Sequence, residues 1–183
     1  MRKLSRDFYV QDTILVAREL LGKYLVYHHN GKKLIGKIVE TEAYLGPHDL
    51  AAHSSKGRTK RTEVMFGAPG FAYVYLIYGM YNCMNVVTQE EGHASAVLLR
   101  AIEPIQNIEG RTQGPGLLCK AMHITKSLNA HDLTSDNFYI AESENTERIV
   151  IVKKSRIGVA YAKEWAKKPL RFYIKNNSFV SKL

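Results

Sequence analysis

Residues 23–43, with the sequence KYLVYHHNGKKLIGKIVETEA, contain the clearest structural signal of the chain. Apolar and β-branched residues lie on both sides of Asn30-Gly31 and partly alternate with polar ones, which is typical of strands. Asn-Gly is a strong signal for a two-residue hairpin turn, because both positions adopt positive φ. The stretch therefore predicts two antiparallel strands, 23–29 and 32–43, joined at this dipeptide.

Outside this stretch the chain predicts more strands than helices. Asp12 can cap a short helix that ends near Gly22, and Gly114-Pro115-Gly116 can open another over 117–123. Segments with strand character lie at 71–77, 82–89, 94–102, 149–152, 157–161 and 170–174, and the first two form a hairpin with its tip at 78–81. Because strands and helices do not alternate regularly, we predict an α+β fold with a mostly antiparallel sheet.

Composition restricts the class of protein. The 183 residues include 26 Lys and Arg against 17 Asp and Glu, a net charge of +9, and contain no repeat or linker. We therefore expect one domain over residues 1–183 and an anionic partner, either nucleic acid, an acidic membrane surface or an acidic protein. Two cysteines cannot form a disulfide framework, which favours a reducing cytoplasm, and no apolar run is long enough to span a membrane.

Several common catalytic motifs are missing from the sequence. It has no Walker A loop, no GxGxxG, no HExxH, no CxxC and no GxSxG elbow. The two cysteines lie far apart and the histidines are scattered, so no spacing typical of metal ligands occurs. We expect no metal and no cofactor, and the chemistry then falls to carboxylate, His, Tyr, Lys or Arg side chains.

Two glutamates and a tyrosine occupy alternate positions in Glu40-Thr41-Glu42-Ala43-Tyr44. On a strand these three side chains share one face. A carboxylate beside an aromatic ring can act as a general base on water. The same pattern also fits a solvated polar face of a sheet, and the spacing does not choose between Glu40 and Glu42.

Tyrosines and cations suggest a contact with nucleic acid. Tyr73 and Tyr75 share one strand face, where packing within the sheet can explain them, but Tyr78 precedes Gly79 at a predicted tip. Exposed loop aromatics usually face a partner. The run at 56–61 is either a solvated loop or a phosphate contact, and its cations are Lys56, Arg58, Lys60 and Arg61.

Longer motifs carry a family resemblance. They are VETEAYLGP (39–47), AAHS (51–54), YVYLIYGMYNCMN (73–85), VLLRA (97–101), GPG (114–116), RIGV (156–159) and EWAKKPLRFY (164–173). In these motifs and in their order, the chain resembles the alkyladenine-type 3-methyladenine DNA glycosylases, or methylpurine-DNA glycosylases. The resemblance covers most of the chain, and the motifs are too long and irregular for chance to explain them.

The resemblance implies a monofunctional enzyme that flips a damaged purine out of duplex DNA and hydrolyses its N-glycosidic bond, leaving an abasic site in base excision repair. Matched position by position, Glu42 is the base that activates water. Arg100 and the backbone of Ile157 match groups that help to hold this water. Glu40 matches a position to which we assign no catalytic role.

The resemblance also implies a base pocket and a DNA contact. The matched pocket residues are Tyr44, His53, Tyr75, Asn85 and Leu98. Among them, Asn85 would disfavour the 2-amino group of guanine. Tyr78 matches a wedge that fills the hole left in the duplex, and Met80 and Tyr81 match minor-groove contacts beside it.

The implied fold is a single compact α+β domain with a curved, mostly antiparallel sheet, flanking helices and a protruding β-hairpin that inserts into DNA. The implied partner is double-stranded DNA containing 3-methyladenine, hypoxanthine or ethenoadenine. We expect a monomer without membrane contact, in a bacterial cytoplasm and associated with the nucleoid.

Two other functions stay open. One is a non-catalytic nucleic-acid-binding module that uses the same basic patch and tip tyrosine. The other is a sugar hydrolase with Glu40 and Glu42 as an acid and base pair. The parallel projection of these two side chains from one strand face disfavours the sugar hydrolase, because they would not flank a bond.

Overall fold

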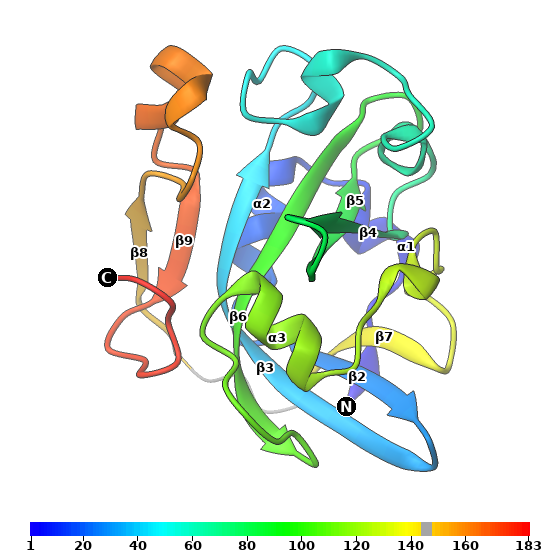
Figure 1. Cartoon of the computed structure of the whole chain (residues 1–183). Coiled ribbons are helices and arrows are strands. Elements are labelled where there is room, and N and C mark those ends of the chain that lie inside the picture. Colours follow the sequence, from blue (N-terminus) through cyan, green and yellow to red (C-terminus); the bar gives the residue numbers. More distant parts are fainter. Residues whose placement is uncertain (144–147) are drawn as a thin grey trace.

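The predicted hairpin lies within the sheet of the molecule. The structure is a computed structural model, and it describes residues 1–143 and 148–183 (Figure 1). β2 (Tyr24–His29) pairs with β3 (Lys32–Tyr44) in antiparallel register, with His29 opposite Lys32. Asn30 and Gly31 have φ values of 48° and 73° at the turn, in the left-handed region that this dipeptide favours. The hairpin prediction is confirmed.

The described strands form one nine-stranded sheet, in which every ladder is antiparallel. The main order is β1-β7-β2-β3-β6-β5-β4, and β9 pairs with both β3 and β8. The remaining strands are β1 (Arg2–Lys3), β4 (Ala72–Ile77), β5 (Tyr81–Thr88), β6 (Ser95–Gln106), β7 (Phe138–Glu142), β8 (Ile151–Lys154) and β9 (Arg171–Ile174).

Short helices accompany this sheet. The α-helices are α1 (Arg6–Tyr9), α2 (Thr13–Glu19) and α3 (Pro115–Ala121), and 3-10 helices lie at His53–Lys56, Glu63–Phe66, Lys126–Leu128 and Ala160–Lys167. The Asp12 carboxylate caps α2 as predicted, by accepting from the amides of Ile14 and Leu15. The molecule is thus a single compact α+β domain with an antiparallel sheet, as the sequence predicted.

β3 has paired neighbours along both edges. β6 follows one edge, while β2 pairs with the first half of the other edge and β9 with residues Glu40–Glu42. The β3–β6 register passes from the pair Glu40–Ala101 to the pair Thr41–Leu99, so Arg100 is an extra residue on β6. Such a bulge redirects a side chain, and bulges are frequent next to active sites.

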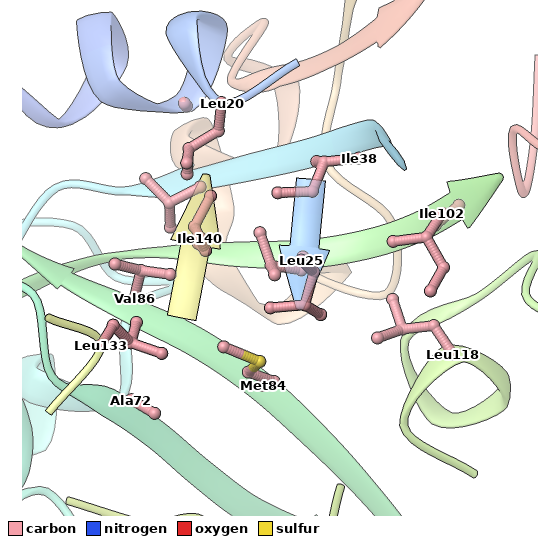
Figure 2. Packing of buried hydrophobic residues seen from close by; sticks show 14 of the residues in the cluster. Leu20, Leu25, Ile38, Ala72, Met84, Val86, Ile102, Leu118, Leu133 and Ile140 are labelled. Atoms are coloured by element: carbon pink, nitrogen blue, oxygen red, sulfur yellow. The ribbon is translucent and has the colours of Figure 1, made fainter. Parts of the chain in front are cut away.

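The core lies on one face of this sheet. Figure 2 shows buried side chains from β2, β3, β5, β6, α3 and the end of α2 meeting there, among them Leu20, Leu25, Ile38, Met84, Ile102 and Leu118. Full burial of one aliphatic side chain contributes about 1.5–3 kcal/mol relative to exposure. Thr41 faces α2, because its hydroxyl donates to the Ala17 carbonyl at 2.7 Å, so its neighbours Glu40 and Glu42 project to the other face.

One predicted strand is wrong. Residues 157–161 alternate like a strand, but Gly158 has a φ of 75° and the chain turns there into the 3-10 helix Ala160–Lys167. Val159 packs instead with Ala51 and Ala162, on a segment that covers the end of β3. The strands β1 and β7 were not predicted, and α3 begins two residues before the predicted start, with Pro115 in its first turn.

Candidate active site

One row of side chains crosses four strands on the face opposite the core. Glu42 of β3 lies beside Leu98 of β6, Leu98 beside Asn85 of β5, and Asn85 beside Tyr73 of β4. Since neighbouring strands lie about 4.8 Å apart, this row spans roughly 14 Å. Residues far apart in the sequence are thus aligned by sheet register alone.

A pocket of about 260 Å³ opens over this row. This volume has room for one bicyclic base. The residues that the sequence singled out and that line the pocket are Tyr44, His53, Tyr73, Tyr75, Tyr78, Asn85, Leu98, Arg100 and Ile157. Glu42 is fully buried directly behind three of these lining residues, namely Tyr44, Arg100 and Ile157.

Hydrogen bonds fix the carboxylate of Glu42. Its Oε1 accepts from the amide of Ile157 at 2.8 Å and lies 3.4 Å from Nη1 of Arg100, and its Oε2 accepts from the hydroxyl of Tyr44 at 2.7 Å. Burial raises the pKa of Glu42 above its usual value, and the charge of Arg100 opposes this shift only in part. Burial and the adjacent Glu42 raise the pKa of Tyr44, so the phenol keeps its proton and donates it.

Arg100 has an unused donor at this point. Its Nε is buried without a hydrogen-bond partner, and lies 3.6 Å from Oε1 of Glu40. Unpaired buried donors are uncommon and usually have a functional reason. Arg100 also lines the pocket, but its Nε is enclosed beside Glu40.

Glu40 has a different environment from Glu42, although both are fully buried. Its Oε1 accepts from Arg171 at 2.8 Å, and its Oε2 accepts from the amide of Ser181 at 2.7 Å. Glu40 thus anchors the C-terminal segment and supports Arg100 from behind. The interpretation of these glutamates as a solvated polar face is wrong, because both side chains are fully buried.

Aromatic rings form the wall opposite the carboxylate. His53 lies with its ring 4.5 Å from that of Tyr75, and its Nδ1 is 3.0 Å from the hydroxyl of Tyr73. Burial, followed by the positive charge of Arg61, lowers the pKa of His53 to about 4. The imidazole is therefore neutral at physiological pH. Tyr73 is a pocket residue that the family match did not include, and its shared face with Tyr75 is the signal that could have found it.

A buried ion pair behind Tyr44 was not predicted. Arg156 donates to both carboxylate oxygens of Asp49, at 2.6 and 2.9 Å, and its guanidinium lies 4.7 Å from the ring of Tyr44. Both charged side chains are fully buried. This pair joins the loop after β3 to the segment that carries Ile157, and no local pattern in the sequence indicates it.

The second hairpin ends in an exposed tip. Tyr78 has a φ of 52° and is 84% exposed, and the amide of Met80 donates to Ile77 across the turn. Met80 and Tyr81 are exposed beside it. Gly116 at the start of α3 lies so close to Tyr81 that a Cβ there would be 3.0 Å from the ring, so α3 supports the base of the tip.

The four cations at 56–61 differ in their partners. Arg58 forms hydrogen bonds with both carboxylate oxygens of Glu63, at 2.9 and 2.5 Å. Arg61 lies 5.3 Å from the ring of Tyr75, at the rim of the pocket. Lys56 and Lys60 are exposed and form no ion pair within the described residues.

The described residues contain no group of three or more His, Cys, Asp or Glu side chains that could hold a metal ion. None of the helices among them is long and apolar enough to cross a membrane.

An aromatic pocket with an anchored carboxylate behind it, on a chain of net charge +9, is typical of an enzyme that acts on nucleic acid. The sequence model of the family described as methylpurine-DNA glycosylase (MPG) matches residues 7–178. The chain belongs to this family. Its members are DNA glycosylases, which hydrolyse N-glycosidic bonds in DNA repair, so the chain is an enzyme of this class with DNA as its partner.

Relatives with the same printed name cover the whole chain. A "Putative 3-methyladenine DNA glycosylase" of Legionella pneumophila (strain Corby) is 67% identical, and the alignment covers 100% of both chains. Relatives of this name from Desulfitobacterium hafniense (strain Y51) and Myxococcus xanthus (strain DK1622) are 48% and 47% identical, over 99% and 95% of their own lengths. Membership of a family of enzymes sets aside the non-catalytic binding module.

Proposed function

We propose that this enzyme flips damaged purines out of duplex DNA and hydrolyses their N-glycosidic bond with a water molecule that Glu42 activates. The observation that carries the proposal is the buried Glu42 carboxylate, held by Ile157 and Tyr44 behind a pocket that fits one base. The proposed substrates are 3-methyladenine, hypoxanthine and ethenoadenine.

Selection begins with stacking. An alkylated purine such as 3-methyladenine is cationic, and a desolvated cation on a tyrosine face gains on the order of 1–2 kcal/mol. Tyr44 and Tyr75 supply such rings in the pocket, and His53 is neutral there, so it does not repel the cation. Flipping a base out of the duplex costs the least free energy when the base is damaged or mispaired. Damaged bases are therefore favoured before they enter the pocket.

The Glu42 carboxylate has acceptor capacity left for water. A carboxylate offers about four lone-pair sites, and the hydrogen bonds from Ile157 and Tyr44 use two. In the proposed reaction the water oxygen bonds to C1′ while the bond from C1′ to the purine nitrogen breaks. The electron pair leaves with the base, and the water proton passes to Glu42. Arg100, which lines the pocket, can orient the same water, and the charge of Glu42 stabilises the cationic sugar.

Asn85 sets a limit on the bound base. It is buried in the pocket, and its amide donates to the carbonyl of Tyr73 at 3.1 Å, so this side chain is held in place. A fixed side chain at this position disfavours the extra 2-amino group of guanine.

The exposed tip is the proposed DNA wedge. Tyr78 would enter the space left by the flipped base, with Met80 and Tyr81 in the minor groove. Lys56 and Lys60, which are exposed and form no ion pair within the described part of the chain, are better placed for phosphate contacts than Arg58, which Glu63 engages.

The sugar hydrolase has no support in this geometry. Glu40 is enclosed by Arg171 and Ser181. Both glutamates also lie within 3.6 Å of the guanidinium of Arg100. Two carboxyl groups in a glycosidase instead flank the bond that is cleaved.

The test is single-turnover excision from duplexes that each carry one 3-methyladenine, hypoxanthine, ethenoadenine or undamaged purine. We expect release of the damaged bases and an intact abasic strand, with undamaged purines retained. Tight binding to lesion duplexes without release of any base contradicts the proposal.

A further inference from the structure

A groove of about 660 Å³, larger than the base pocket, lies elsewhere on the described residues. The three segments that line it lie in the lower half of Figure 1. These are the β2–β3 turn with His29 and Lys32, the loop 107–111 after β6, and α3 with the residues that follow it. The proposed reaction uses none of these side chains.

The groove is positively charged. Lys32, Arg111 and Lys120 contribute one cation from each segment, and the carboxylate among the lining residues is Glu109. All three cations are exposed, and none forms an ion pair with a carboxylate within residues 1–143 and 148–183. Cations that three separate segments present to one concave surface suit a ligand with regularly spaced anionic groups.

The walls of the groove are held in fixed positions. The rings of His29 and His123 stack across it, 4.8 Å apart and 12° from parallel, which joins the β2–β3 turn to the end of α3. The amide of Asn107 donates to the carbonyl of Lys33 at 2.9 Å, which joins the loop to the same turn.

His123 follows α3 with a φ of 56°, in the left-handed region where histidine, like Asn and Asp, is enriched over other L residues. This conformation is common at the end of a helix, and the ring of His123 lies against that of His29.

α3 links this groove to the base pocket. Pro115 at its start lines the pocket, and Lys120 near its end lines the groove. At ~1.5 Å rise per residue these two positions are roughly 8 Å apart. DNA bound at the pocket extends well beyond this distance, at about 3.4 Å per base pair, and it carries charge along its whole length.

We propose that this groove binds the phosphate backbone of duplex DNA away from the flipped base. The inference deepens the proposed function and rests on it for the position of the duplex. The groove supplies affinity without base recognition, and it extends the contact surface along α3.

The test compares two triple variants that each remove three positive charges. The groove variant is Lys32→Ala, Arg111→Ala and Lys120→Ala, and the matched control is Lys153→Ala, Lys154→Ala and Lys175→Ala, at exposed positions on and next to β8 and β9. The affinity for an undamaged 25-base-pair duplex is measured by fluorescence anisotropy over a range of salt concentrations. The logarithm of affinity falls with the logarithm of salt concentration by a slope of about 0.9 for each phosphate contact. The slope of the groove variant should therefore be smaller than that of the wild type by roughly 2–3. Its affinity at low salt should be at least tenfold lower.

We expect the control variant to stay within about threefold of the wild type at low salt, because backbone contacts and not net charge set the slope. Equal changes in the two variants overturn the proposal. Acetylation of lysines gives a local readout, in which the duplex should protect Lys32 and Lys120 but not Lys153. Equal protection by inorganic phosphate at the same phosphate concentration also overturns it, since the site would then be one for free anions.

These results are separate from the proposed function. Undamaged DNA reports on the groove, whereas release of hypoxanthine by the wild type reports on the pocket. A wild type that releases no base contradicts the proposed function, and the comparison of the two triple variants still decides whether the groove binds DNA.

Discussion

Two identical residues two positions apart acquire different chemistry from their partners. Glu40 accepts from Arg171 and from the amide of Ser181, so its carboxylate is occupied with holding the chain together. Glu42 accepts from Tyr44 and Ile157, both of which line the pocket, and these two hydrogen bonds leave lone pairs of its carboxylate unused. At the scale of the residue, these contacts decide which carboxylate is the candidate base.

Replacing Glu42 with Gln keeps its shape and removes both the base and the charge. We expect the single-turnover rate to fall by about 10²–10⁴. This corresponds to roughly 3–5 kcal/mol of barrier at ~1.4 kcal/mol for each tenfold change. Affinity for lesion DNA should change little, because stacking in the pocket and the phosphate contacts remain.

Glu40→Gln is the matched control. It should lose far less activity at saturating enzyme, while the free energy of unfolding falls by about 1–3 kcal/mol because buried Arg171 loses its charged acceptor. An inactive Glu40→Gln variant together with an active Glu42→Gln variant contradicts the assignment.

The raised pKa of Glu42 gives a pH dependence with a defined sign. Glu42 acts when it is ionised, so the rate on a cationic base should decrease with falling pH, with a midpoint above the usual 4.5. His53 is mostly neutral above pH 5, since burial lowers its pKa to about 4. Excision of 3-methyladenine measured between pH 4.5 and 8 checks this, and a midpoint at or below 4.5 contradicts it.

The contribution of Glu42 to the free energy of unfolding should decrease with rising pH, whereas the excision rate increases. A pKa raised in the folded state means that Glu42 stabilises the fold at low pH and that this contribution is lost as pH rises through the folded pKa. The Glu42→Gln variant cannot ionise. Its Tm relative to wild type should therefore increase from pH 4.5 upward and then level off above the folded pKa of Glu42.

Asn85 allows a test of base selection. Asn85→Ser shortens the side chain that the carbonyl of Tyr73 holds in the pocket. We expect guanine release at mismatches to rise by roughly 10–100-fold relative to hypoxanthine release, since exclusion of one small group is worth about 1–3 kcal/mol. An unchanged ratio of guanine to hypoxanthine release removes Asn85 from the selectivity argument.

Among the elements, the β4–β5 hairpin carries residues of the pocket on its strand β4 and an exposed residue at its turn. Tyr73 and Tyr75 on its strand β4 line the pocket, while Tyr78 at its turn is exposed. Tyr78 also lines the pocket mouth, so one hairpin positions both the walls and the tip.

Tyr78→Ala should therefore weaken flipping more than loose association with DNA. Loss of a stacked ring is worth about 1–3 kcal/mol, so we expect lesion excision to fall by roughly 10–100-fold. Nonspecific affinity and its salt slope should stay close to those of the wild type, because charge supplies them. A reduced salt slope with normal excision identifies Tyr78 as a surface contact instead of a wedge.

For the molecule as a whole, the residues that line the pocket indicate whether water or a lysine amine attacks the sugar. Within the described part of the chain, no lysine lines it, although the protein has a net charge of +9. A Schiff base requires an amine at the reacting carbon. We therefore expect product strands with intact abasic sites and no covalent protein–DNA adduct after treatment with borohydride. An adduct trapped in this way contradicts water as the nucleophile.

The alternation of the strands, the hairpin at Asn30-Gly31 and the cap at Asp12 could all be predicted from the sequence. These features depend on neighbours within a few residues, so local patterns predict them. The motifs around Glu42, Tyr75 and Arg100 were likewise sufficient to indicate the family. The strand predicted at 157–161 was wrong because it also relied on a local pattern. An alternating pattern cannot show that Gly158 turns the chain.

The assembly of the site depends on contacts between distant segments. Sheet register placed Glu42, Leu98, Asn85 and Tyr73 in one row, and the bulge at Arg100 turned its side chain toward both glutamates. The buried pair of Arg156 and Asp49 joins positions that are 107 residues apart. Contacts between distant segments depend on strand order and register, and burial then sets the pKa of each group, so neither is encoded in any single stretch of the chain.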